Sequence, residues 1–214
     1  MADYIKGLYR GNKAAPVPST VHNAADRDME DTRTYLADNP QYFEPQRSNT
    51  FTFVVSDLSD IDLASFGITN LPMPSAREAL ELSVKASSVP HFDIEPLTIN
   101  RGNNQMKFAG KPTFKEGQIT IHDYIGTYAK DILLAWQRQA YDARTGKIGL
   151  AADYKRTATL YELTPDYQII RSWKMYGCWV SSMSEGNYDH DSSDARTVDA
   201  TIIYDYAEPQ IYKD

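Results

Sequence analysis

Hydrophobic residues recur at every second position through most of the chain after residue 49, and this period constrains the fold more than any other feature. A period of two places alternate side chains on opposite faces of a β-strand. The residues on one face are apolar and those on the other are largely polar, which is typical of half-buried antiparallel strands. The predicted strands are residues 50–55, 80–87, 97–101, 105–108, 117–122, 154–163, 168–180 and 196–206.

One segment has the helical period instead. We expect a helix over about residues 124–142, capped by Asp123, whose apolar face includes Ile132, Leu133 and Trp136. Strands therefore precede and follow a single amphipathic helix, and alternating βαβ units are absent. This order predicts a mainly β fold, a β-barrel or sandwich with one α-helix packed against it.

The hydrophobic pattern and the composition of the chain change near residue 48. Residues 1–48 are polar and interrupted by prolines, and only residues 23–36 have a pattern that fits one short helix. We expect residues 1–48 to form an irregular N-terminal arm and residues 49–214 to form the β domain. Residues 57–79 read as a long loop within that domain.

A β-hairpin is predicted around residues 97–108. Its turn, Gly102-Asn103-Asn104, contains residue types that tolerate positive φ angles. Its flanks carry Ile99, Met106 and Phe108, which are too apolar for a two-stranded arm surrounded by water. We therefore expect these three side chains to be buried by a neighbouring molecule.

Composition excludes several classes of function. The chain has 214 residues and a formal net charge of −7, which argues against a protein that grips nucleic acid through clustered cations. The single cysteine, Cys178, lies in an apolar stretch and reads as a buried hydrophobe. The sequence shows neither a signal-peptide pattern nor an apolar run of the ~20 residues that a membrane span needs. We expect a soluble protein made in the cytoplasm.

No pattern in the sequence predicts a catalytic residue, a cofactor site or a metal site. Asp189, Asp191 and Asp194 have oxygen ligands suited to a hard cation, but their spacing lacks the glycine and the distal glutamate of a calcium loop. A solvated acidic turn between two strands is the favoured interpretation. The neighbours His122 and Asp123 would point to opposite sides of a strand, so they do not form an acid–base pair.

The order of several short motifs resembles one family, the tail tube proteins of contractile-tailed bacteriophages. A hairpin ends in Ala109-Gly110, Thr-Phe follows, and a strand then closes on an aspartate just before the helix. The matching segments are Thr113-Phe114, Ile119–Ile121, Asp123, Leu134-Ala-Trp-Gln137, Tyr154-Lys-Arg156, Trp173–Trp179 and Val198–Tyr206. The resemblance covers roughly residues 49–208, and the N-terminal arm and the loop at 57–79 depart from the family pattern.

This resemblance implies a structural virion protein rather than an enzyme. Six subunits would form a ring, a homo-hexamer, and stacked rings would form the tail tube, with the hairpin at 97–108 reaching a neighbouring subunit or ring. The implied partners are the tail sheath protein, the tape measure protein, the baseplate and the tail terminator. DNA would pass through the lumen without specific binding, no membrane would be involved, and the tube would be assembled in the host cytoplasm. The haemolysin-coregulated tube protein of type VI secretion shares the architecture that the resemblance implies.

Three other functions remain open. The first is a tube subunit of a non-phage contractile injection particle or secretion system. The second is a monomeric β-sandwich binding module that uses exposed tyrosine and tryptophan side chains. The third is a metal-dependent hydrolase built on the acidic segment at 185–194, which predicts tight divalent-cation binding and measurable turnover.

Overall fold

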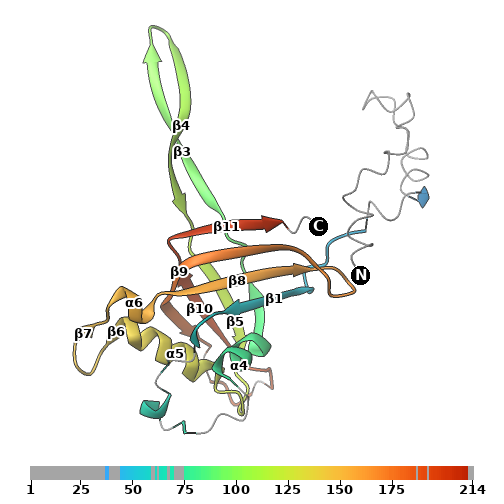
Figure 1. Ribbon diagram of the computed structural model, residues 1–214, viewed down its shortest axis with the longest axis vertical. Helices are drawn as coiled ribbons and strands as arrows, with labels where there is room; N and C mark the ends of the chain where they lie inside the picture. The colour runs from blue at the N-terminus through green and yellow to red at the C-terminus, as the bar shows by residue number, and fades with distance from the viewer. Residues whose placement is uncertain are drawn as a thin grey trace.

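The computed structural model describes residues 37–38, 44–58, 61, 63–66, 68–69, 75–186, 188–191 and 193–211. The predicted short helix at 23–36 lies outside the described residues, as does most of the predicted arm and part of the predicted loop at 57–79. The described chain consists mainly of antiparallel strands with helices packed on one side, and a long hairpin projects from one end (Figure 1). The predicted fold class, mainly β with a packed helix, is confirmed.

Strands of very different lengths, from 2 to 17 residues, make up most of the described chain. They are β1 (Phe51–Val55), β2 (Val84–Ser87), β3 (Phe92–Arg101), β4 (Asn104–Phe114), β5 (Gly117–His122), β6 (Tyr141–Asp142), β7 (Lys147–Ile148), β8 (Arg156–Leu163), β9 (Ile169–Glu185), β10 (Thr197–Ile203) and β11 (Tyr206–Ile211). The helices are the 3-10 helix η3 (Ala64–Phe66) and the α-helices α4 (Ala76–Ser83), α5 (Ala129–Ala140) and α6 (Ala151–Tyr154).

Seven strands form one antiparallel sheet in the order β1-β8-β9-β10-β5-β2, with β11 pairing to β9 beside this path. Strand β9 is 17 residues long and pairs with different strands along its two halves. Its first half pairs with β8 and β11, and its second half pairs with β10. The strands do not close into a barrel, since β1 and β2 form the two ends of the path. The predicted barrel is in this respect an open, strongly bent sheet.

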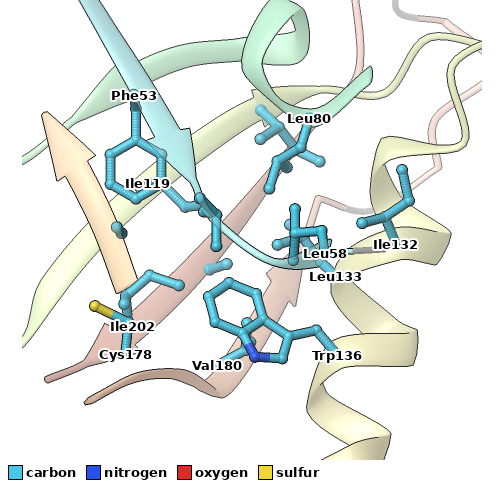
Figure 2. Close-up of a cluster of buried hydrophobic side chains, with 14 of the residues drawn as sticks. Phe53, Leu58, Leu80, Ile119, Ile132, Leu133, Trp136, Cys178, Val180 and Ile202 are labelled. Atoms are coloured by element: carbon cyan, nitrogen blue, oxygen red, sulfur yellow. The ribbon is translucent and has the colours of Figure 1, made fainter. Parts of the chain in front are cut away.

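The hydrophobic core lies between this sheet and helices α4 and α5. Alternate residues of the strands point into it, as in β5, where Ile119 and Ile121 are buried. Figure 2 shows the α5 side chains Ile132, Leu133 and Trp136 directed toward side chains from the strands. All three are fully buried, with none of their surface exposed. Their burial holds the helix against the sheet, because apolar surface removed from water stabilises the contact.

Polar side chains of α5 fix its position on the sheet. The Trp136 indole Nε1 donates a hydrogen bond to the Tyr154 carbonyl oxygen over 2.7 Å, and Gln137 Nε2 donates to the Ser181 carbonyl over 3.1 Å. These bonds satisfy buried polar groups that would otherwise destabilise the core. The adjacent Trp-Gln pair therefore joins one helix to two separate segments, α6 and β9.

Helix α5 begins later than the sequence predicts. Residues 124–127 form a turn, and the residue that precedes the helix, Tyr128, has a left-handed φ of 53° without a side-chain cap. The predicted cap, Asp123, instead lies 3.6 Å from the guanidinium of Arg196. The prediction was wrong because a distant cation competes for this carboxylate, and the local sequence does not reveal that partner. At the other end, Tyr141 and Asp142 leave the helix to form β6.

The predicted strand at 80–87 is a strand only from Val84 onward. Residues 76–83 form α4 instead, and the described residues contain three α-helices where the sequence predicted one. Ser75 caps α4, with its side-chain oxygen accepting a hydrogen bond from the Glu78 amide. The alternation of Leu80 and Leu82 was misleading, because Leu80 is buried and Leu82 lies exposed on the outer side of the helix.

The last predicted strand, 196–206, is divided into β10 and β11. Asp205 lies in the turn between them and accepts hydrogen bonds of 2.8 Å at both carboxylate oxygens from Lys155 Nζ. It packs against Gly177, which has a left-handed φ of 69° and has no room for a side chain. A glycine in this conformation lets β9 bend, and the bend lets β9 pair with β10 on one side of the turn and β11 on the other.

Candidate assembly interface

Strands β3 and β4 form a hairpin that is separate from the main sheet. They pair only with each other along residues Phe92–Phe114, and every residue of β3 is exposed. Figure 1 shows the hairpin extending away from the sheet along the long axis of the molecule. An isolated two-stranded hairpin is marginally stable in water, so its exposed side chains are the first candidates for a contact with another molecule.

One face of the distal hairpin is apolar. Leu97 pairs directly with Phe108, and Ile99 pairs directly with Met106, so the four side chains share a face. They are 56%, 47%, 48% and 45% exposed, respectively. The predicted residues Ile99, Met106 and Phe108 are therefore brought together on one surface. Leu97 was not among them, although its position two residues before Ile99 places it on the same face.

The other face of the distal hairpin is polar. Thr98 pairs with Lys107, and Asn100 pairs with Gln105. The ribbon thus has one surface suited to burial and one suited to water, although the described residues of this chain cover neither. An amphipathic ribbon of this kind fits against an apolar surface with its polar side facing outward.

Glycines determine the shape of the hairpin at two points. Gly102 begins the turn between β3 and β4 with a φ of 62°, which is the place of glycine in a type II′ turn. Gly110 lies where the pairing register shifts between Ile94 and Pro96, and a side chain there would collide with the carbonyl oxygen of Glu95. The Ala109-Gly110 step is therefore explained by a β-bulge that admits no side chain.

Aromatic side chains anchor the base of the hairpin to the core. The rings of Phe92 and Phe114 lie 5.3 Å apart, and Phe114 meets Tyr204 edge-on at 6.1 Å. Tyr204 is buried, and burial raises the pKa of its hydroxyl. The hairpin is consequently fixed where it leaves the body and free of contacts with the described residues along its outer part.

Charged residues gather where β9 ends and β10 begins. Arg196 pairs with Glu185 and lies 3.6 Å from Asp123, and its guanidinium stacks on the Tyr188 ring at 4.1 Å. Lys130 of α5 donates to Glu185 over 2.8 Å, and this hydrogen bond lowers the pKa of the Glu185 carboxyl. Glu185, the last residue of β9, is thereby joined to the N-terminal end of α5.

The described residues offer little for catalysis. They hold no group of three or more His, Cys, Asp or Glu placed to bind a metal, and this search included Asp189, Asp191 and Asp194. Cys178 is fully buried, and burial raises the pKa of its thiol to about 12, so it stays protonated at neutral pH. These surroundings make Cys178 part of the core rather than a nucleophile.

A groove of about 670 Å³ lies between the C-terminal half of α5 and β9. Asp142 lines this groove, and its carboxylate accepts hydrogen bonds from the Thr145 hydroxyl and the Arg144 amide. The hydrogen bond from Thr145 contributes most to lowering the pKa of Asp142. Arg138 pairs with the same carboxylate at 3.2 Å. Since Asp142 is ionised and already has these partners, it is poorly suited to act as an acid or a base.

None of the helices in the described part of the chain is both long and apolar enough to cross a membrane.

Comparisons with known proteins relate the chain to contractile tails. No family model matches the sequence. The tail tube protein gp19 of Enterobacteria phage T4 is 26% identical to it over 129 residues, which are 58% of this chain and 78% of the phage protein. The tail tube protein gp19 of Enterobacteria phage T6 matches with the same identity and the same coverage.

Solved structures share the fold. A chain of the PVC sheath–tube complex, an extracellular contractile injection system in its extended state, matches with a TM-score of 0.55 and 14% identity over 84% of this chain and 97% of its own. A chain of the anti-feeding prophage tube-terminating cap matches with a TM-score of 0.53 and 14% identity over 78% of this chain and 92% of its own. The sequence similarity to the phage proteins, together with this fold, supports a tube protein of the contractile-tail kind.

Proposed function

We propose that the protein assembles as hexameric rings and that the rings stack into the inner tube of a phage tail, which conducts the genome into the host. The observation that carries the proposal is the amphipathic hairpin of β3 and β4. It projects from a complete core and leaves four large apolar side chains, Leu97, Ile99, Met106 and Phe108, open to solvent. Exposed apolar surface of this kind marks a protein–protein contact, and a tube supplies such a contact for every subunit.

The partners follow from the same proposal. Matching chains come from a sheath–tube complex, a tube-terminating cap and a baseplate of contractile particles. By analogy we assign this tube a surrounding sheath, a baseplate at one end, a terminator at the other and a tape measure protein inside. The protein is then a component of the virion, assembled in the host cytoplasm, with a structural role and no catalytic one.

One sheet face is suited to line the channel. Eight side chains of β5, β10 and the last residues of β9 point away from the core and are polar, namely Gln118, Thr120, His122, Thr197, Asp199, Thr201, Ser182 and Ser184. This set contains no lysine or arginine, and its one carboxylate, Asp199, accepts a hydrogen bond from Thr120. DNA adheres to clustered cations, so we propose that DNA slides past this face without binding.

Replacing Asp199 by arginine should make this channel retain DNA. Asp199 is exposed, so the substitution leaves the fold intact while placing one cation per subunit on the proposed lining. Tubes assembled from the variant should hold a fluorescent single-stranded DNA that wild-type tubes release, and salt should reverse the retention. Glu208→Arg, an exposed change on β11, is the matched control. Equal retention by the two variants would place Asp199 outside the channel.

Electron microscopy of the purified full chain tests the proposed function. Rings with six-fold symmetry, or tubes built from them, are the expected particles. A monodisperse monomer at every concentration would overturn the proposal and favour the binding module with exposed aromatic side chains. Neighbouring capsid and terminase genes would distinguish a phage tail from another contractile injection particle.

The N-terminal arm should contribute to assembly rather than to folding. We propose that a chain beginning at Ser48 keeps the β domain, because residues 1–47 are polar, contain four prolines and lack a pattern that builds a core. Its thermal transition should match that of the full chain, and negative-stain images should show fewer or less stable tubes. Loss of the cooperative transition would move the domain boundary toward the N-terminus.

A further inference from the structure

The distal part of the β3–β4 hairpin is basic as well as apolar. Between Leu97 and Phe114 the sequence contains Arg101, Lys107 and Lys111 and no aspartate or glutamate. All three cations are exposed, and no ion pair is found for them among the described residues. At the base of the hairpin, Lys115 pairs with Asp93 at 2.8 Å. The outer part has no acidic residue, so its positive charge is not neutralised within the hairpin.

The end of the sheet that lies away from the hairpin carries negative charge. The loop between β9 and β10 carries three carboxylates, Asp189, Asp191 and Asp194, and all three residues are exposed. Two large apolar side chains are exposed at the same end of the sheet, Tyr188 at 83% in this loop and Ile125 at 101% in the turn after β5. We call these five residues the acidic end.

Strand β5 shows that the hairpin and the acidic end lie on opposite sides of the body. The hairpin returns to the sheet at Phe114, and β5 starts at Gly117 just after it. At the other end of β5, His122 pairs with Thr197, the first residue of β10 after the acidic loop. The two surfaces are thus separated by the length of β5, about 20 Å at ~3.4 Å per residue. Figure 1 shows the hairpin projecting beyond the sheet on the side away from α4 and α5.

We propose that the hairpin of one copy docks on the acidic end of the next copy, head to tail. This inference rests on the proposed stacking of rings and specifies which two surfaces meet. The hairpin brings three cations and an apolar face, and the acidic end brings three carboxylates and two exposed apolar side chains. Opposite potentials steer such surfaces together and penalise the reverse orientation. Because the two surfaces differ, the contact is heterologous and repeats along an axis instead of closing on itself.

Charge reversal in the full-length chain tests the docking. The first variant carries Arg101→Glu, Lys107→Glu and Lys111→Glu, and the second carries Asp189→Lys, Asp191→Lys and Asp194→Lys. All six positions are exposed, so both variants should keep the wild-type circular dichroism spectrum. Each variant alone now has like charges on both surfaces. We expect rings of each variant without tubes in negative-stain images, while wild-type protein forms tubes.

Mixing the two variants gives the decisive result. The acidic hairpin of the first variant then meets the basic end of the second, and the basic hairpin of the second meets the acidic end of the first. Tubes should therefore return in an equimolar mixture. They should also return in a chain that carries all six substitutions, whose net charge equals that of the wild type because three cations and three anions exchange places.

The outcomes separate this inference from the proposed function. Tubes of normal length from either variant alone would overturn the docking and leave the tube intact as the function. The docking would also be overturned if tubes formed neither in the mixture nor from the chain that carries all six substitutions. Wild-type protein that forms neither rings nor tubes would overturn the proposed function and the docking with it. Salt gives an independent measure. The Debye length falls from about 10 Å at 0.1 M salt to about 3 Å at 1 M, so high salt should weaken the docking and shorten wild-type tubes.

Discussion

Replacing Trp136 by alanine should lower the free energy of unfolding by about 3–5 kcal/mol, the usual cost of removing a large aromatic side chain from a core. Trp136 is fully buried, at the centre of the contact between α5 and the sheet. The substitution leaves a cavity and also removes the donor that satisfies the Tyr154 carbonyl oxygen. Both losses act in the same direction, so this is the largest single-site effect on stability that we expect.

Chemical denaturation of the isolated subunit measures this effect. For a domain of this size, about 2–4 °C of melting temperature corresponds to each kcal/mol, so thermal unfolding should occur roughly 6–20 °C lower. Leu82→Ala is the matched control, because Leu82 lies on α4 and is 67% exposed. A Trp136→Ala protein with the midpoint of the control would show that this face of α5 does not stabilise the fold.

Replacing Met106 by aspartate should abolish tube growth while the subunit stays folded. Met106 lies on the apolar face of the hairpin opposite Ile99 and remains 45% exposed in the single subunit. A carboxylate there costs the free subunit little, because water still solvates it. In a tube the same carboxylate would have to enter an apolar contact, and burying an unpaired charge is strongly unfavourable. Each ring repeats the penalty at all of its subunits, so even a moderate penalty prevents stacking.

Two variants separate the apolar contact from other causes. Met106→Leu keeps an apolar side chain of similar size and should form tubes. Gln105→Asp introduces the same charge one residue away, on the polar face opposite Asn100, and should shorten tubes at most. Circular dichroism checks the fold, and negative-stain microscopy measures tube length. Normal tubes from a folded Met106→Asp protein would exclude this hairpin face from the interface.

The strands of the main sheet were predictable because one face of each is buried. Residues 117–122 are an example, since the alternation of Ile119 and Ile121 with polar residues gives the observed bounds of β5. The hairpin was predictable for a different reason. Gly102 supplies the positive φ that a tight turn requires, and a tight turn fixes the register of the two strands beside it.

Helix α4 was missed although the sequence contains its signal. Ser75-Ala-Arg-Glu78 has the spacing of a capping box, and the Ser75 side chain does cap the helix at the Glu78 amide. The short apolar alternation that follows is compatible with either period over so few residues. The start of α5 had no such signal, because Asp123 is held by Arg196, more than seventy residues away in the chain. A contact of this kind comes from the tertiary fold and is invisible to local patterns.

The candidate interface was predictable only in part. Apolar residues on a turn-linked hairpin predict a surface that another molecule covers, and Ile99, Met106 and Phe108 were predicted as interface residues on this ground. The sequence did not predict the proposed receiving surface, since its apolar members, Ile125 and Tyr188, belong to different loops. Arg196 links these two loops, because its guanidinium stacks on the Tyr188 ring and pairs with Asp123.

The buried Cys178 gives the protein an internal reporter of local opening. It is the single cysteine of the chain, and its thiol has no access to solvent in the closed structure. A thiol reagent therefore reacts only when β9 separates from its neighbours, and the labelling rate measures how often this happens. The same measurement works inside an assembled particle, where denaturant titrations do not distinguish unfolding from disassembly. Comparing free subunits with tubes by this rate would show how far assembly protects the core of each subunit, without any engineered probe.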